Sequence, residues 1–303
     1  MTLLSPAPLS LEEREREYSP SSCIGGNYAP YIAQYATLSE DALNTGSRHR
    51  ELAYGSDAAH KLDLFLPEPS ASATLPPLLL FIHGGYWQEL SKASSLFPAP
   101  DCTNAGIAFA AIDYTLAPQA SVHDMVLECR KALRWLHQHG QELGFDPARI
   151  IVAGSSAGAH LAAMCCLRNW ADDSDLPAGV PAASVLVSGV YELQPLVGTS
   201  INEALSLDLD SARVISPELL DLTGFPPTVI GWGEIETSEF KRQSQTFAKA
   251  LEALGAQYLP PIEMPARNHF DVILDLARPG TALGNATHAL FASLPATSSG
   301  SNS

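Results

Sequence analysis

The chain has 303 residues, and 46% of them are hydrophobic, which is enough apolar material for one domain with a large core. Its 17 Lys and Arg residues stand against 33 Asp and Glu, and the net charge of −16 argues against binding to nucleic acids or anionic membranes, which need a basic surface. No apolar run reaches the roughly 18 residues that cross a bilayer.

The start of the chain and its cysteines indicate one cellular compartment. Residues 11–17 read Leu-Glu-Glu-Arg-Glu-Arg-Glu and lack the basic start and apolar centre of a secretory signal. The five cysteines are too few and too irregularly spaced for a disulfide framework, which predicts reduced thiols. We therefore expect a cytoplasmic protein in which Cys165 and Cys166 are core residues.

Composition divides the chain into three predicted parts. Residues 1–44 form an N-terminal extension that we expect to be partly disordered, residues 45–295 form the catalytic domain, and residues 296–303 form a flexible tail. The extension contains the tyrosines Tyr18, Tyr28, Tyr31 and Tyr35. They either cover the mouth of an active site or pack the extension onto the core, and both interpretations stay open.

Strand and helix patterns alternate along the catalytic domain. The strand patterns lie at residues 60–66, 77–83, 107–112, 149–153, 184–187 and 227–232. A helix opens at Ser121, with Asp124 supporting its cap, and residues 191–222 indicate a helical excursion between two strands. This alternation predicts an α/β fold with a mostly parallel sheet and helices on both of its faces.

The strand at 77–83 leads into the loop His83-Gly-Gly-Tyr-Trp87. Glycines directly after a strand let backbone N–H groups point into a site, as an oxyanion hole requires. We expect the His83 side chain only to brace this loop, because the N–H groups would take part in the chemistry. Tyr86 and Trp87 either line the substrate pocket or anchor the loop.

Residues 154–158 have the sequence Gly-Ser-Ser-Ala-Gly between an apolar strand and an Ala-rich helix. In this setting G-x-S-x-G is typical of a nucleophile elbow, whose central serine lies at a helix N-terminus that favours negative charge. We predict Ser156 as the nucleophile. The predicted oxyanion donors are the backbone N–H groups of Gly85, Tyr86 and Ala157. The predicted pocket residues are Trp87, Ser155 and Trp232.

A general base is expected downstream, because this elbow is followed along the chain by an acid and then a histidine. His269 and His288 lie far enough along the chain. His288 falls in a helical pattern at 281–294, which is typical of a solvated helix face. His269 lies in a loop, after a strand-like segment at 257–262 and before an apolar helix expected near Asp271, so we predict His269 as the base.

The acid is expected after the strand at 227–232, where Glu234 and Glu236 precede an amphipathic helix that Thr237 or Ser238 could cap. A carboxylate here would hold the histidine tautomer and stabilise the imidazolium, and glutamate can replace aspartate in this role. Both glutamates meet this requirement, and we favour Glu236.

Four motifs resemble the kynurenine formamidase (arylformamidase) group of α/β-hydrolases, which is related to the hormone-sensitive-lipase-like esterases. They are His83–Trp87, Gly154–Gly158, Ser188-Gly-Val-Tyr-Glu192 with Pro195-Leu196, and Glu239-Phe-Lys-Arg-Gln243. The resemblance covers about residues 18–294. It implies Ser156 as nucleophile, His269 as base and Gly85 with Tyr86 as oxyanion donors. At the position of Glu236 this group usually has an aspartate.

The predicted function is that of a metal-independent serine hydrolase. The resemblance implies an aryl formamide such as N-formylkynurenine as substrate. The alternatives are a carboxylesterase or other amide or carbamate hydrolase with the same triad and, in another class, a binding module without catalysis. We expect no cofactor or metal, since His137-x-His139 lacks further ligands nearby. The expected partner is a small-molecule substrate, and a homodimer is compatible with the sequence.

Overall fold

The computed structural model describes residues 9–45, 48–69, 74–168, 170 and 176–295, and the expectations for residues 1–8 and 296–303 lie outside this range. Within it, an eight-stranded sheet has the order β1-β2-β4-β3-β5-β6-β7-β8. The strands are β1 Arg48–Ala53, β2 Lys61–Leu66, β3 Leu78–Ile82, β4 Ala108–Ile112, β5 Ile150–Ser155, β6 Ala183–Val187, β7 Thr228–Ile235 and β8 Ile262–Asn268. Neighbours from β4 to β8 pair in parallel, and β2 is antiparallel to β1 and β4, which confirms the mostly parallel sheet.

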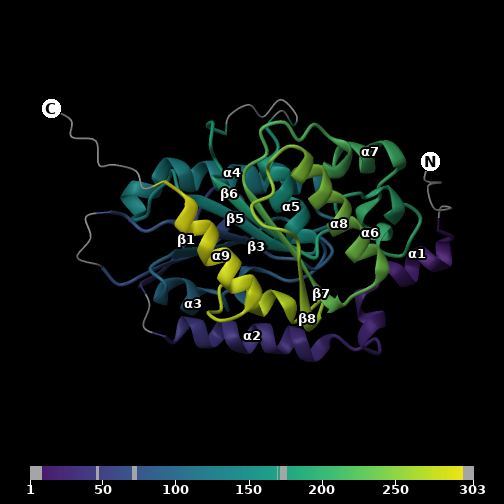
Figure 1. The fold of residues 1–303 in the computed structure, drawn as a ribbon, viewed down its shortest axis with the longest axis horizontal. Helices are drawn as coiled ribbons and strands as arrows, with labels where there is room; N and C mark the ends of the chain where they lie inside the picture. Colours follow the sequence, from purple (N-terminus) through teal and green to yellow (C-terminus); the bar gives the residue numbers. More distant parts are fainter. Residues whose placement is uncertain (1–8, 46–47, 70–73, 169, 171–175, 296–303) are drawn as a thin grey trace.

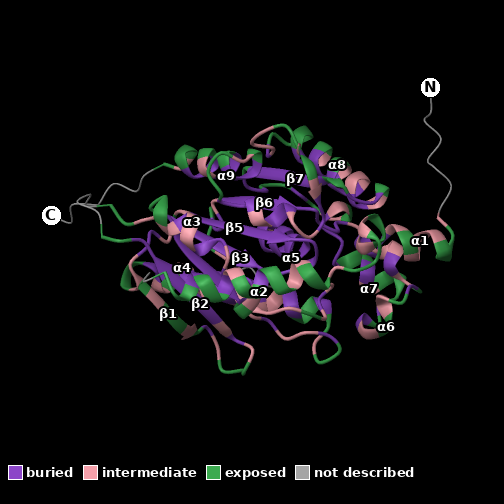
Figure 2. Cartoon of the chain, turned by 90° about the horizontal axis from the view of Figure 1, so that it is seen from below, coloured by how far each residue is buried: buried purple, intermediate pink, exposed green. Residues whose placement is uncertain are grey.

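Helices cover both faces of this sheet (Figure 1). One layer consists of α4 Val122–Leu143, α5 Ala157–Cys166 and α8 Ser238–Ala253. The other consists of α2 Ala29–Leu43, α3 Ala99–Asn104 and α9 Ala282–Ser293. Figure 2 shows the buried strands between these layers. Strand β3 shows why both faces need a helix layer, because its side chains are apolar on both faces. Leu78, Leu80 and Ile82 pack in the core under the first layer. Leu79 and Phe81, which point to the opposite face, pack in the core under the second layer.

The N-terminal extension has regular structure from residue 11 onward. It forms α1 Leu11–Glu17, the 3₁₀ helix η1 Pro20–Ile24 and then α2. Helix α2 buries Tyr35, Ser39 and Ala42 against the rest of the chain. The sequence pattern did not predict α2, because the helix buries few positions and several of its exposed residues are apolar, so no clear apolar stripe marks its buried face.

The helical excursion after β6 is confirmed in the described residues. It contains η3 Gln194–Leu196, α6 Asn202–Leu205, α7 Leu209–Val214 and η4 Pro217–Leu219. Helix α4 begins as predicted, since Ser121 and Asp124 form a reciprocal capping box. Cys165 and Cys166 are buried in the core, as expected.

The predicted boundaries around the last two strands were wrong. Strand β7 continues to Ile235, and β8 begins at Ile262, where the strand-like segment was expected to end. Residue Gln257 makes only an isolated bridge to Thr228. Strand β8 is an edge strand with mostly exposed or half-buried residues, so its sequence mixes polar and apolar residues, contains a proline and resembles a loop. The predicted apolar helix after it is the short 3₁₀ helix η5 Val272–Asp275.

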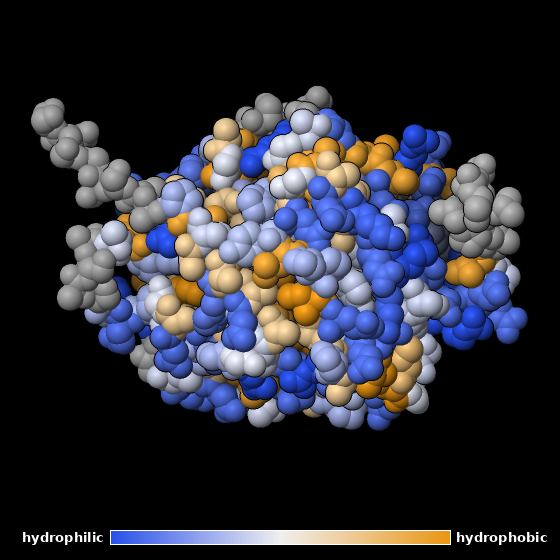
Figure 3. All heavy atoms as spheres, viewed as in Figure 1, coloured by the Kyte–Doolittle hydropathy of each residue, from blue (hydrophilic) through white to orange (hydrophobic). Residues whose placement is uncertain are grey.

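The surface is predominantly polar on the face shown in Figure 3, where apolar residues form smaller groups between hydrophilic ones. No helix in the described part of the chain has the length and apolar character needed to cross a membrane.

Candidate active site

Ser156 lies at a sharp turn between β5 and α5. Its backbone has φ 56° and ψ −122°, which is a strained conformation for a residue with a side chain. A Cβ atom at Gly154 would come closer than 3.0 Å to the carbonyl oxygen of Gly158, and one at Gly158 would come equally close to that of Ile82. The two glycines are therefore required by close backbone contacts, which is the local geometry of a nucleophile elbow.

The loop after β3 lies directly against this serine. A Cβ atom at Gly84 would lie 3.4 Å from the Cβ atom of Ser156. The loop closes into a turn in which the N–H groups of Gln88 and Glu89 both donate to the carbonyl oxygen of Gly85 at 2.9 Å. Gly85 itself has φ 96°.

The backbone N–H groups of Gly85, Tyr86 and Ala157 have no hydrogen-bond acceptor within the described residues. Ala157 is the first residue of α5, where helix geometry leaves N–H groups without an intrahelical partner.

His83 braces the loop, as expected. Its Nδ1 lies 2.9 Å from the carbonyl oxygen of Gly84, and its ring stacks on Tyr114 with centroids 4.4 Å apart. The Tyr114 hydroxyl also donates to the carbonyl oxygen of His83 at 3.0 Å. Burial lowers the pKa of His83 to about 4, so this imidazole is neutral near pH 7.

His269 and Glu236 form a buried pair. Nδ1 of His269 lies 3.1 Å from Oε2 of Glu236, and both side chains are at most 5% exposed. The second carboxylate oxygen, Oε1, accepts hydrogen bonds of 2.6 Å from the Gly233 N–H and from the Ser188 hydroxyl. The carboxylate is therefore held at both oxygens while it faces the imidazole.

Glu234 has a different environment. It is exposed, and its Oε2 accepts a hydrogen bond from the N–H of Ala266 at 2.8 Å. The register of the pairing between β7 and β8 shifts between Gly233 and Ile235. Of the two glutamates that the sequence left open, Glu236 is the one that contacts His269.

Ser188 is a site residue to which the sequence analysis gave no role. It follows β6 as Glu236 follows β7, and these strands are parallel neighbours, so their carboxyl ends lie side by side. The sequence could not place Ser188 beside Glu236, because that requires the order of the strands in the sheet. The one sign of a site residue in the sequence was a serine directly after a buried strand.

The structure does not place Trp87 or Trp232 in the pocket predicted for them. The Trp87 side chain is fully buried and its Nε1 donates to Nδ1 of His160 at 3.2 Å, so Trp87 anchors the loop. Successive side chains of β7 point to opposite faces of the sheet, and Trp232 lies on the same face as Ile230. Both residues pack in the core beneath α8. Ser155 and Tyr86 do line the pocket.

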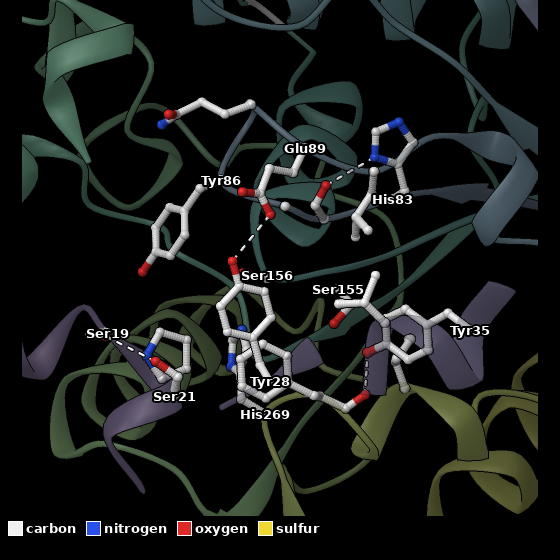
Figure 4. A pocket seen from close by; sticks show the side chains of 18 of the residues that line it. Ser19, Ser21, Tyr28, Tyr35, His83, Tyr86, Glu89, Ser155, Ser156 and His269 are labelled. Carbon is white, nitrogen blue, oxygen red and sulfur yellow. Dashed lines mark hydrogen bonds between the residues drawn. The ribbon is translucent and has the colours of Figure 1, made fainter. Parts of the chain in front are cut away.

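The pocket is a cavity of about 370 Å³ that contains both Ser156 and His269 (Figure 4). Tyr18, Tyr28 and Tyr35 of the extension also line it. Tyr31 packs on Phe270 instead, with ring centroids 5.7 Å apart. The extension therefore both covers the cavity and packs onto the core. Among the described residues, no group of three or more His, Cys, Asp or Glu residues could hold a metal ion.

Comparisons with known proteins agree with this architecture. The family profile BD-FAE matches residues 62–184. A kynurenine formamidase from Salmo salar is 30% identical over 281 residues, which cover 88% of this chain and 92% of that protein. A crystal structure of a candidate thioesterase from Silicibacter sp. TM1040 is 30% identical with a TM-score of 0.76, covering 92% of this chain and 99% of that one. A bacterial heroin esterase is 25% identical with a TM-score of 0.63, covering 90% and 91%.

Proposed function

This chain belongs to the kynurenine formamidase family of α/β-hydrolases, and from this premise we propose that it hydrolyses aryl formamides, with N-formylkynurenine as the first substrate to test. That it is a hydrolase of the formamidase or esterase type follows from its relatives. The observation that best supports the proposal is the buried contact between Glu236 and His269, because His269 lines the same cavity as Ser156.

The first step is attack of the Ser156 hydroxyl oxygen on the formyl carbon. His269 takes the serine proton at Nε2, because its Nδ1 faces Glu236. Glu236 holds the imidazole in this tautomer and stabilises the imidazolium that forms. Ser188 and the Gly233 N–H keep the carboxylate in place during this step.

The tetrahedral intermediate carries a negative oxygen. The free N–H groups of Gly85, Tyr86 and Ala157 are the donors for this oxygen, and one such donor typically contributes about 3 kcal/mol to transition-state stabilisation. His269 then returns the proton to the amine nitrogen, the C–N bond breaks, and the aryl amine leaves. Water, deprotonated by His269, attacks formyl-Ser156 and releases formate.

The lining of the cavity suits an aryl leaving group. Tyr28 and Phe270 both line it, and their rings stack with centroids 5.3 Å apart and an interplanar angle of 8°. Aromatic side chains such as these can pair favourably with the ring of an aryl substrate.

A carboxylesterase is the second candidate, because the bacterial heroin esterase shares this architecture and the same machinery cleaves esters. The test compares kcat/KM of the purified protein for N-formylkynurenine and for p-nitrophenyl acetate, with Ser156→Ala as control. We expect kcat/KM to be higher for N-formylkynurenine than for the ester. If only the ester is turned over, the protein is a carboxylesterase and the formamidase proposal is rejected. Absence of both activities and of fluorophosphonate labelling would indicate a binding module.

A further inference from the structure

We propose that Glu89 is a specificity-determining residue that binds an ammonium group on the leaving-amine part of the substrate. The inference rests on the proposed function, because it concerns the substrate of the same cavity. It specifies the substrate class as aryl amides or esters with a cationic side chain.

The charges around the cavity have one sign. Its charged lining residues are Glu15 and Glu89, and no Lys or Arg is among the described residues that line it. A cavity with carboxylates and no cation favours a substrate group that is positive over one that is negative. The net charge of −16 acts in the same direction at longer range.

Glu15 and Glu89 differ in whether their carboxylate oxygens can accept further hydrogen bonds. Both carboxylate oxygens of Glu15 are engaged by Ser200, one by its N–H at 2.6 Å and the other by its hydroxyl at 2.7 Å. The Glu89 carboxylate is exposed, and its one hydrogen bond within the described residues comes from the Tyr28 hydroxyl at 3.5 Å. Glu89 therefore keeps acceptor positions for a donor from the substrate.

Glu89 is held close to the proposed chemistry. Its own N–H closes the turn onto Gly85, so its backbone belongs to the loop that carries the proposed oxyanion donors. On the opposite side, Tyr28 stacks on Phe270, the residue after His269. Figure 4 shows the Glu89 carboxylate and the Tyr28 hydroxyl directed toward each other across the pocket. The Glu89 charge also raises the pKa of Tyr28.

Nearby cations are engaged elsewhere. Arg14 donates to the carbonyl oxygens of Pro195 and Val197 at 2.8 and 2.6 Å. Lys92 is paired with Glu51 and Asp63 at 2.9 and 2.7 Å. A carboxylate on the substrate thus meets no charged donor among the described lining residues. For an α-amino-acid side chain such as that of N-formylkynurenine, the ammonium is the group that the site binds.

The test uses three aryl formamides that are identical except for the end of their ortho side chain, which is an ammonium, a hydroxyl or a carboxylate. For the wild type we expect kcat/KM to decrease in that order. Glu89→Gln should lower the ratio of ammonium to hydroxyl substrate about five-fold through KM, the upper range for an exposed ion pair. Glu252→Gln, which removes an exposed charge on α8 outside the cavity lining, should leave the ratio unchanged.

The three product amines are also titrated calorimetrically into the wild type and Glu89→Gln. This readout needs no turnover, so it separates the inference from the proposed function. Equal affinity of the wild type for the ammonium and hydroxyl amines, or an ammonium preference that persists in Glu89→Gln, would overturn the role of Glu89. Failure to cleave any of the formamides, with the binding preference intact, would overturn the proposed reaction alone.

Discussion

The hydroxyl of Ser188 donates a hydrogen bond of 2.6 Å to Oε1 of Glu236, while Oε2 of the same carboxylate lies 3.1 Å from Nδ1 of His269. The glutamate side chain is one methylene longer than the aspartate that the family usually has here. Two donors on Oε1, Ser188 and the Gly233 N–H, restrict the rotamers of this longer side chain. Ser188, at the end of the neighbouring strand β6, thereby helps to orient the imidazole of His269 through Glu236.

Replacing the two glutamates separately tests the assignment of the acid. Glu236→Gln should retain the shape of the side chain but lose the charge, and kcat should fall by as much as about 10⁴-fold, as in a well-studied triad. Glu234→Gln should change kcat little, because its carboxylate faces Ala266. Glu236→Asp should retain part of the activity. Steady-state kinetics of the three variants decide this, and a collapse in Glu234→Gln alone would reassign the acid.

Ser188→Ala tests whether Ser188 positions Glu236. Loss of a hydrogen bond to a charged group should reduce kcat about ten-fold. If Ser188 acts through Glu236, this loss should disappear when Ser188→Ala is introduced into Glu236→Gln, which a double-mutant cycle measures. A merely structural effect would instead reduce kcat in both backgrounds equally.

Glu17 caps α8 from the N-terminal extension. Its Oε2 accepts hydrogen bonds from the Ser238 N–H at 3.1 Å and the Ser238 hydroxyl at 2.5 Å, two residues after Glu236. Glu17→Ala should reduce the free energy of unfolding by about 1 kcal/mol, as the loss of a helix cap usually does. Thermal or urea unfolding measures this. The control is Glu12→Ala, because Glu12 is an exposed residue of α1, the helix that contains Glu17. An equal loss of stability in Glu12→Ala would reject the capping role of Glu17.

We expect the ionisation of Glu218 to make the free energy of unfolding depend on pH. Burial, with a contribution from the charge of Glu192, raises the pKa of Glu218 from its usual value near 4.5 to about 7, and its buried Oε2 has no hydrogen-bond partner within the described residues. Because the folded-state pKa is the higher one, the folded state binds more protons between these values, so stability should decrease as pH rises from about 4.5 to 7.

Glu218→Gln should therefore increase the free energy of unfolding at pH 8 by about 1 kcal/mol, after allowance for partial exposure, and have little effect at pH 4.5. Denaturant unfolding at the two pH values measures the difference. An equal effect of the substitution at both values would show that Glu218 does not ionise differently on folding.

Sequence reasoning worked where the structure depends on a few consecutive residues. The turn at Ser156 follows from glycines two residues to either side, and the start of α4 follows from the Ser121 capping box. The strands in the middle of the sheet were recognised because both of their faces are buried, which makes them uniformly apolar. Edge strand β8 was predicted with the wrong boundaries and helix α2 was not predicted, because each buries only part of its surface.

The tertiary structure decided what depends on residues far apart in the chain. Both Glu234 and Glu236 meet the requirement for the acid in sequence, and the register shift between β7 and β8 accompanies the arrangement in which Glu236 meets His269. The role of Ser188 depends on β6 and β7 being neighbours. The inward orientation of Trp87 depends on a hydrogen-bond partner 73 residues away. Local backbone preferences are encoded by a few adjacent residues, whereas the partners of a side chain depend on the order of the strands within the sheet.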